Sequence, residues 1–352
     1  MINIIGGGPI GCYSAALLSK NNEVTIYEEN KEVGLPIACT GILSDTINEI
    51  ISLKKDFVAN KIHSARIYSP NKKIVKINFK KPNVIVFRNK FDQYFRDKAL
   101  DNGARINYKT KLVGRNKVMN LETRKKKKIK SNKLIGADGP ASKVSQIYGF
   151  GKRKYLIGVQ ALIKKKNDNF VDFYPHIGTY AWAVPESRNV LRVGVAAKNN
   201  TMKIFKSFSK KYTGKIIGWQ GGLIPLHEPG LIATKKNVFL VGDAAAQIKN
   251  TTGGGLVPGL MAAEELKKAI DKNKDYDVLW KKRIGKSIWT HYFVRNIMNK
   301  FDSEDWNKLI EMFSNRKMKE LLSKESRDKP IRILMKAFIH NPSILLFLRK
   351  LM

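Results

Sequence analysis

The chain has 352 residues, and its 66 lysines and arginines outnumber its 29 acidic residues, giving a net charge of +37. Hydrophobic residues make up 43% of it, enough for a sizeable core, which excludes a disordered basic tail. Two cysteines exclude a disulfide framework and fit a reducing, intracellular setting, and the five histidines show no metal-ligand spacing. The charge alone fits a nucleic acid, an anionic membrane or a phosphorylated substrate as partner, and equally an AT-rich genome that favours lysine codons.

The first elements of the chain predict a dinucleotide-binding fold. Residues 1–5 read as an apolar strand, 12–20 as a helix and 23–27 as a second strand. The glycines between the first strand and the helix have G-x-G-x-x-G spacing. Gly6 permits the tight turn, Gly8 lets the backbone approach a pyrophosphate, and Gly11 lets the helix pack closely on the strand. Glu28, directly after the second strand, is placed to accept hydrogen bonds from a ribose diol.

Two later segments repeat the pattern of an apolar strand that ends in a turn with an aspartate. Residues 134–140 end in Asp-Gly-Pro, and residues 238–245 contain Gly242-Asp243, followed by glycines at 253–255 and a predicted helix over 257–270. The Asp243 carboxylate can bind a ribityl hydroxyl, and the amides at the start of this helix can stabilise an anionic reduced flavin. The three segments in this order predict FAD as the cofactor.

Residues 151–230 alternate apolar and polar side chains in short runs, which predicts an antiparallel sheet over the flavin. Tyr180 and Trp182 are two apart, so on a strand both point to the same face. This face could bind an isoprenoid chain, or the two rings could belong to the core of the sheet, and spacing alone favours the core.

The C-terminal residues 331–352 mix apolar and basic side chains, and Pro342 is expected to divide them into two short helices. The sequence contains no run of about 18 apolar residues, so no membrane-spanning helix is predicted. The two helices could rest on an anionic membrane surface or pack on the body of the protein.

Four sets of residues together resemble the FAD-dependent geranylgeranyl reductases, and within them the archaeal digeranylgeranylglycerophospholipid reductases. The first set is the N-terminal fingerprint with Glu28, and the second is the segment 34–41, which contains Pro36 and Cys39. The third is Tyr-Ala-Trp-Ala-Val-Pro at 180–185 with Gly194 after it, and the fourth is Gly242-Asp243 with the glycines at 253–255. The first and fourth sets are shared with the aromatic hydroxylases, whereas the second and third are more specific to the reductases.

The resemblance implies that reduced FAD transfers a hydride to C=C bonds of geranylgeranyl chains, with an isoprenoid lipid as substrate. It implies Cys39 as the catalytic residue or a flavin neighbour, and Tyr180 and Trp182 as substrate-binding residues. It implies no metal and no nucleic acid, and NAD(P)H, ferredoxin or a deazaflavin as electron donor. The residues expected to bind the cofactor are Gly6, Gly8, Gly11, Glu28, Cys39, Thr40, Arg88, Val113, Asp243, Gly255 and Leu256.

The expected fold is of the α/β (α+β) class, with a Rossmann-type FAD-binding domain interleaved with an antiparallel-sheet substrate domain and followed by a helical part. The FAD-binding domain is expected over 1–60, 85–150 and 233–270, the substrate domain over 61–84 and 151–232, and the helical region over 271–352. We expect a cytoplasmic protein, peripheral at the inner face of the cell membrane. An aromatic monooxygenase of the same fold is the alternative, and a non-enzymatic basic protein on a vestigial flavin fold is a third reading.

Overall fold

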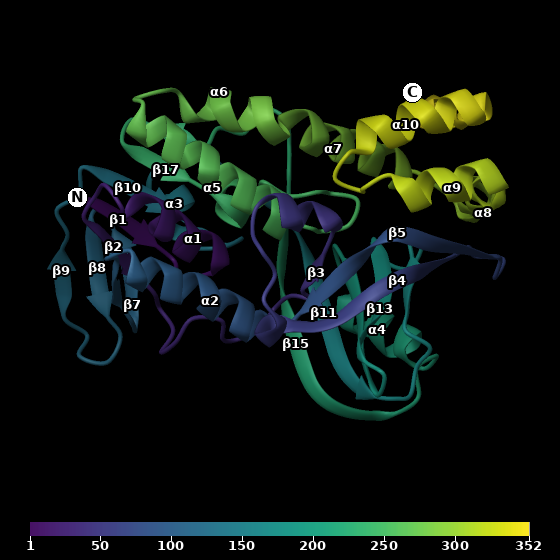
Figure 1. Cartoon of the computed structure of the whole chain (residues 1–352), viewed down its shortest axis with the longest axis horizontal. Helices are drawn as coiled ribbons and strands as arrows, with labels where there is room; N and C mark the ends of the chain where they lie inside the picture. The colour runs from purple at the N-terminus through teal and green to yellow at the C-terminus, as the bar shows by residue number, and fades with distance from the viewer. Residues whose placement is uncertain (352) are drawn as a thin grey trace.

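The computed structural model describes residues 1–351 and contains two large sheets, one at the left and one at the lower right of Figure 1. The first sheet has six strands, which are parallel except for the edge strand β16. The short apolar runs in β1 and β10 are buried, as expected for strands covered on both faces. In spatial order the strands are β16 (Thr234–Lys235), β17 (Val238–Leu240), β10 (Lys133–Gly136), β1 (Ile2–Ile5), β2 (Val24–Tyr27) and β6 (Arg105–Asn107).

Three helices pack around this sheet: α1 (Pro9–Leu18), α2 (Arg88–Asp101) and α5 (Leu256–Asp271). The predicted order of strand, glycine turn, helix, strand and acid is confirmed. The helix begins at Pro9 and not at Cys12, because proline is well suited to a first helical turn, where its missing N–H would have no partner. A short helix, α3 (Lys143–Ile147), follows the Asp-Gly turn after β10.

The second sheet has eight strands, antiparallel except where β12 pairs with β4. The antiparallel sheet expected over residues 151–230 is confirmed, and α4 (Thr201–Ser209) packs on its β14 and β11 strands. In spatial order the strands are β15 (Lys215–Leu226), β11 (Lys154–Lys164), β14 (Val190–Ala197), β13 (Tyr180–Ser187), β12 (Phe170–Tyr174), β4 (Val58–Tyr68), β5 (Ile74–Val86) and β3 (Ile42–Leu43).

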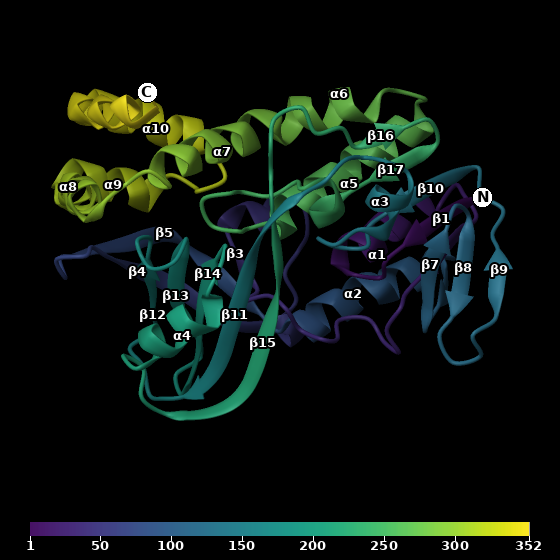
Figure 2. The ribbon, with the colours of Figure 1, turned by 180° about the vertical axis from the view of Figure 1, so that it is seen from behind.

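Smaller elements complete these two layers. A three-stranded sheet stands at the outer side of the parallel sheet, as Figure 2 shows from behind. Its strands are β7 (Thr110–Gly114), β8 (Lys117–Asn120) and β9 (Lys126–Lys128). Single 3-10 turns occur at η1 (Asp45–Glu49), η2 (Lys55–Phe57) and η3 (Gly242–Ala245).

The C-terminal region is helical, as predicted, and runs along one side of the molecule until it reaches the far end of the second sheet (Figures 1 and 2). There α8 and α9 pack on β5, with Ile310 buried against Val75 and Ile77. Asp302 starts α8 with a reciprocal capping box to Asp305. The elements are α6 (Tyr276–Trp280), η4 (Lys281–Gly285), α7 (Lys286–Met298), α8 (Ser303–Ser314), α9 (Arg316–Lys324), α10 (Pro330–His340) and η5 (Pro342–Leu351).

The break at Pro342 divides the last residues into α10 and η5, as the sequence predicts. Within residues 1–351 no single helix has the length and apolar character needed to span a bilayer, and α10 and η5, which do so only together, bend by 116° at the break. The division of the chain into domains remains a proposal. The strands suggest boundaries at 58 and 86 in place of 61 and 84, because β4 and β5 belong to the eight-stranded sheet over this whole range.

Candidate functional site

A cavity of about 940 Å³ lies at the carboxyl ends of β1 and β2, where ligands bind in open α/β sheets. The structure brings together seven of the residues expected to hold the cofactor, since all of these line the cavity: Gly6, Gly8, Glu28, Cys39, Arg88, Val113 and Asp243. A side chain added at Gly8 would meet no atom within 4 Å, which leaves the backbone open to a ligand. Gly6 has φ +100, and a Cβ at Gly11 would lie 2.1 Å from the Gly6 oxygen, so both glycines are required by the turn itself.

Glu28 is buried at the end of β2 and accepts a 2.6 Å hydrogen bond from the Gly7 backbone N–H. Its other carboxylate oxygen accepts from the backbone and side chain of Asn30, both at 2.8 Å. The carboxylate is thus fixed beside the glycine turn, where a ribose diol can reach it.

A second cavity of about 650 Å³ lies between the eight-stranded sheet, the glycine loop before α5 and the segment after α9. Both cavities include Ala38, Cys39, Leu223 and Asp243 in their walls, so they meet at these residues. Thr40, Gly255 and Leu256, predicted as cofactor contacts, line the second cavity and not the first.

Two ionisable side chains lie where the two cavities meet: Asp243 lines both cavities, and Arg88 lines the first. Arg88, at the start of α2, donates from Nε and Nη2 to both carboxylate oxygens of Asp92, at 3.0 and 2.9 Å, and its guanidinium lies beside the Cys39 thiol. The Asp243 carboxylate makes no hydrogen bond with any described residue and touches the start of α5, where a Cβ at Gly255 would lie 2.5 Å from Oδ1. Burial raises the pKa of Asp243 to about 6, against the opposing effect of Arg88. A buried carboxylate without a donor is suited to a ligand hydroxyl.

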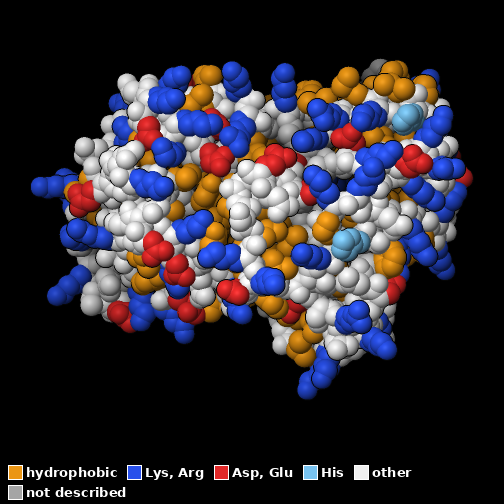
Figure 3. Space-filling model, viewed as in Figure 1, with side chains coloured by type: hydrophobic (Ala, Val, Ile, Leu, Met, Phe, Trp, Pro, Cys, Tyr) orange, Lys and Arg blue, Asp and Glu red, His pale blue; other side chains and the backbone are white. Residues whose placement is uncertain are grey.

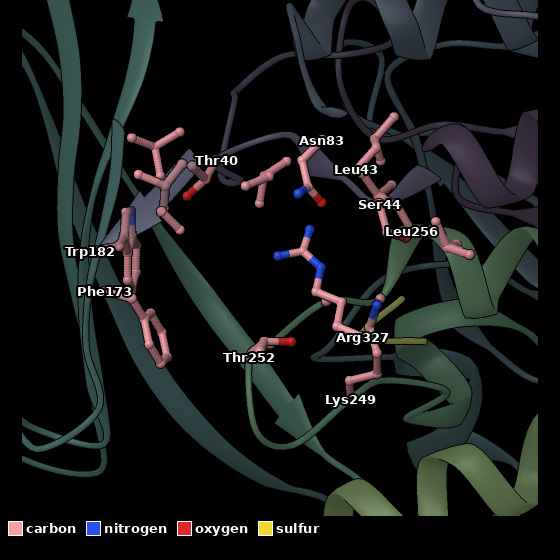
Figure 4. A pocket seen from close by; sticks show the side chains of 18 of the residues that line it. Thr40, Leu43, Ser44, Asn83, Phe173, Trp182, Lys249, Thr252, Leu256 and Arg327 are labelled. Atoms are coloured by element: carbon pink, nitrogen blue, oxygen red, sulfur yellow. The ribbon is translucent and has the colours of Figure 1, made fainter. Parts of the chain in front are cut away.

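The wall of the second cavity on the eight-stranded sheet is aromatic, as Figure 4 shows for Trp182 and Phe173. Tyr180 and Trp182 lie on the same face of β13, as predicted, with ring centroids 5.9 Å apart. The Tyr180 hydroxyl is buried without a hydrogen-bond partner, and burial raises its pKa. It points at Gly253, where a Cβ would lie 2.3 Å from it. The predicted pair therefore faces both the cavity and the glycine loop.

The polar network that holds this wall was not predicted from the sequence. Gln160, buried on β11, accepts hydrogen bonds at Oε1 from Trp182 Nε1 at 2.8 Å and from Thr40 Oγ1 at 2.7 Å. Its amide donates to Gln220 Oε1 at 2.5 Å. A glutamine inside an otherwise apolar strand was the available signal, because a buried amide needs partners.

The role of Arg295, on α7, was also not predicted from the sequence. Its side chain holds the backbone of the loop before α5. It donates to the backbone carbonyls of Thr179 at 3.1 Å, Asn250 at 3.3 Å and Thr251 at 2.8 Å. Its guanidinium also lies 5.6 Å from the centre of the Tyr180 ring. Burial lowers the pKa of Arg295 to about 10, so it remains protonated at neutral pH.

A buried ion pair attaches the C-terminal region to the site. Asp328, just before α10, pairs with Lys249, which lies 79 residues earlier in the chain. It also accepts a hydrogen bond from Ser44, which lies 284 residues earlier. The neighbouring cations and Ser44 lower the pKa of Asp328 although burial opposes this. The C-terminal region carries no recognisable motif, yet it supplies one wall of the second cavity.

Comparison with known proteins agrees with this arrangement. Residues 4–44 match the model of the NAD(P)-binding Rossmann-like domain. The chain is 28% identical to digeranylgeranylglycerophospholipid reductase 3 of Methanosphaera stadtmanae, over 99% of this chain and 98% of that protein. It is 25% identical to the digeranylgeranylglycerophospholipid reductase of Methanothrix thermoacetophila, over the same shares.

Among solved structures, a geranylgeranyl bacteriochlorophyll reductase-like protein from Thermoplasma acidophilum superposes with a TM-score of 0.85 and 23% identity. The match covers 100% of this chain and 98% of that one, so the two share their fold throughout. The predicted resemblance to the archaeal digeranylgeranylglycerophospholipid reductases is confirmed, because the chain is similar to such proteins over nearly its whole length.

Proposed function

We propose that this protein is an FAD-dependent reductase that saturates C=C bonds in the geranylgeranyl chains of archaeal-type ether phospholipids. The observation that carries this proposal is the meeting of the two cavities at Cys39 and Asp243. One has the glycine turn and the ribose-binding acid of a dinucleotide site, and the other is walled by aromatic and aliphatic side chains. The reductase names of the full-length relatives support the same activity.

FAD fits the first cavity better than NAD, because the cavity runs on from the glycine turn to Arg88, Cys39 and Asp243. We propose that Glu28 binds the adenosine ribose and Asp243 a ribityl hydroxyl. The glycines at 253–255, at the N-terminus of α5, would offer backbone N–H groups and the positive end of the helix dipole to the flavin ring. Bound FAD, once reduced, supplies the hydride that an isolated alkene needs.

The chain itself must hold the alkene, exclude water and supply a proton. Trp182 and Phe173 provide an apolar surface for a flexible isoprenoid, which burial of the chain would stabilise. Cys39 lies at the junction and is our candidate for the proton donor. The electron donor is proposed to be NAD(P)H, ferredoxin or a deazaflavin, since the sequence has no second dinucleotide fingerprint.

Anaerobic turnover separates the reductase from an aromatic monooxygenase of the same fold. With dithionite-reduced FAD and no oxygen, the purified protein is expected to add two hydrogen atoms per double bond to digeranylgeranylglyceryl phosphate, detected by mass spectrometry of the lipid. A monooxygenase needs oxygen to form product, so the absence of saturated lipid under these conditions, with flavin bound, would refute the proposal. A preparation that never retains flavin would instead favour a non-enzymatic protein.

We also propose that α10 rests on an anionic membrane surface at the cytoplasmic face. Two apolar side chains of α10 are largely exposed, Met335 at 62% and Ile339 at 71%. Figure 3 shows apolar side chains gathered at that end of the molecule, with lysines and arginines around them.

Replacing both Met335 and Ile339 with glutamate is expected to lower binding to phosphatidylglycerol vesicles by roughly tenfold or more, measured by co-sedimentation. Val278→Glu, at a 60% exposed apolar residue of α6, is the control and should bind as the wild type does. Equal loss in both variants would argue against a membrane-binding α10.

A further inference from the structure

Arg327 occupies an unusual position, in the segment between α9 and α10. Figure 4 shows its side chain reaching into the middle of the second cavity, between Thr252 and Asn83. Its Nε is buried without a hydrogen-bond partner, and its guanidinium forms no hydrogen bond or ion pair with any residue of the described chain. Burial lowers its pKa, and the nearby carboxylates of Asp328 and Asp45 offset part of that effect.

The backbone at Arg327 and Asp328 is held by side chains of α7. His291 Nε2 donates to the Arg327 carbonyl at 3.1 Å, and Ser287 Oγ donates to the Asp328 carbonyl at 3.0 Å. The Asp328 side chain is fixed by Lys249 and Ser44. These contacts fix the backbone from which the Arg327 side chain enters the cavity.

The Arg327 side chain is partly buried, and although the Asp328 and Asp45 carboxylates are near, neither forms an ion pair or hydrogen bond with its guanidinium. A partly desolvated cation that has no direct partner in the protein is suited to bind an anionic ligand. Its planar fork matches phosphate oxygens in a bidentate geometry, whereas an isoprenoid offers it nothing. The cavity entrance adds cations from two sides, with Lys80 and Lys81 on β5 and Arg332 on α10. Two carboxylates near the entrance are already paired, Glu49 with Lys329 at 3.9 Å and Glu325 with Lys336 at 2.5 Å.

We propose that the Arg327 guanidinium binds the phosphate of the lipid headgroup, while the aromatic wall opposite holds the chain. This inference rests on the proposed function and deepens it, since it selects phosphate-bearing lipids over neutral ones. Arg327 then determines substrate specificity, and the reductase acts on lipids that already carry a phosphate.

The test compares two lipids with the same chains, digeranylgeranylglyceryl phosphate and neutral digeranylgeranylglycerol, in detergent with reduced FAD. Wild-type KM is expected to be at least about tenfold lower for the phosphate-bearing lipid. Arg327→Gln should raise that KM by roughly 10- to 100-fold and leave the KM for the neutral lipid within about twofold. Arg327→Lys should recover part of the difference because it keeps the charge. Arg316→Gln removes a cation whose side chain is 93% exposed and should have no effect.

Several outcomes would overturn the inference. Equal losses on both lipids in Arg327→Gln, with flavin retained, would mean that Arg327 only shapes the cavity. Competitive inhibition by inorganic phosphate, with both lipids reduced at the same wild-type KM, would show a free-phosphate site. If the wild type reduces neither lipid, the proposed function fails separately, and quenching of tryptophan fluorescence by the two lipids still measures the headgroup preference. The same affinity for both lipids in that assay would reject it.

Discussion

Substituting Gly194 with alanine is expected to remove most of the turnover while leaving the cofactor bound. Gly194 on β14 lies directly opposite Trp182 on β13, and an alanine Cβ would approach the indole to 2.4 Å at Cζ2 and 2.9 Å at Nε1. The ring must move, because real side chains do not tolerate such contacts, and its 2.8 Å hydrogen bond to Gln160 is lost. We expect kcat/KM to fall by about 100-fold or more, the usual cost of a misplaced positioning group.

The matched control is Gly218→Ala on β15, where an added Cβ would meet only Leu162, at 3.8 Å. Flavin absorbance and the melting temperature should be near wild type in the control. Overpacking is expected to lower the stability of Gly194→Ala by about 1–3 kcal/mol. Turnover at the wild-type level in Gly194→Ala would show that the indole does not contribute to substrate binding.

The second large effect separates cofactor binding from turnover at the two residues where the cavities meet, Asp243 and Cys39. Asp243→Ala is expected to weaken FAD retention by roughly 10- to 100-fold, because the carboxylate has no hydrogen-bond partner in the protein and would take one from the ribityl chain. Cys39→Ser should retain FAD and lose turnover, by about 100-fold or more if the thiol delivers the proton. Gel filtration followed by flavin absorbance measures the first effect, and anaerobic product formation the second. Equal loss of cofactor in both variants would contradict this division.

FAD retention should also depend on pH through Asp243. Its pKa without ligand is about 6, so below pH 6 the carboxyl is protonated and must lose its proton to accept a hydroxyl donor as a carboxylate. Affinity should therefore fall as the pH drops below about 6, by up to tenfold per pH unit. Asp243→Asn should bind FAD weakly at every pH and without this dependence.

The parts of the fold that could be predicted from the sequence are those whose geometry depends only on residues close together in the chain. The turn at Gly6 to Gly11 and the acid at Glu28 lie within one strand, helix and strand, so spacing alone indicates their geometry. Tyr180 and Trp182 could be placed on one face because a strand alternates.

The rest depends on contacts between distant segments. Nothing in the sequence near Ser44, Lys249 or Asp328 indicates that the three meet. A single arginine between two amphipathic helices likewise has no pattern that marks it as part of a cavity wall. The role of Gly194 became explicable only from the strand register, which places it under the Trp182 ring.

The order of strands in the six-stranded sheet has a consequence for how the protein folds during synthesis. β1 is made first, but its neighbour β10 comes 128 residues later, and β17 must follow before the sheet is complete. The second cavity closes only when the segment around Arg327 and Asp328 has left the ribosome, since until then Lys249 lacks its counter-ion. A nascent chain therefore carries unpaired strands and exposed apolar surface for most of its translation, which makes it dependent on slow, long-range pairing and prone to aggregation when released early.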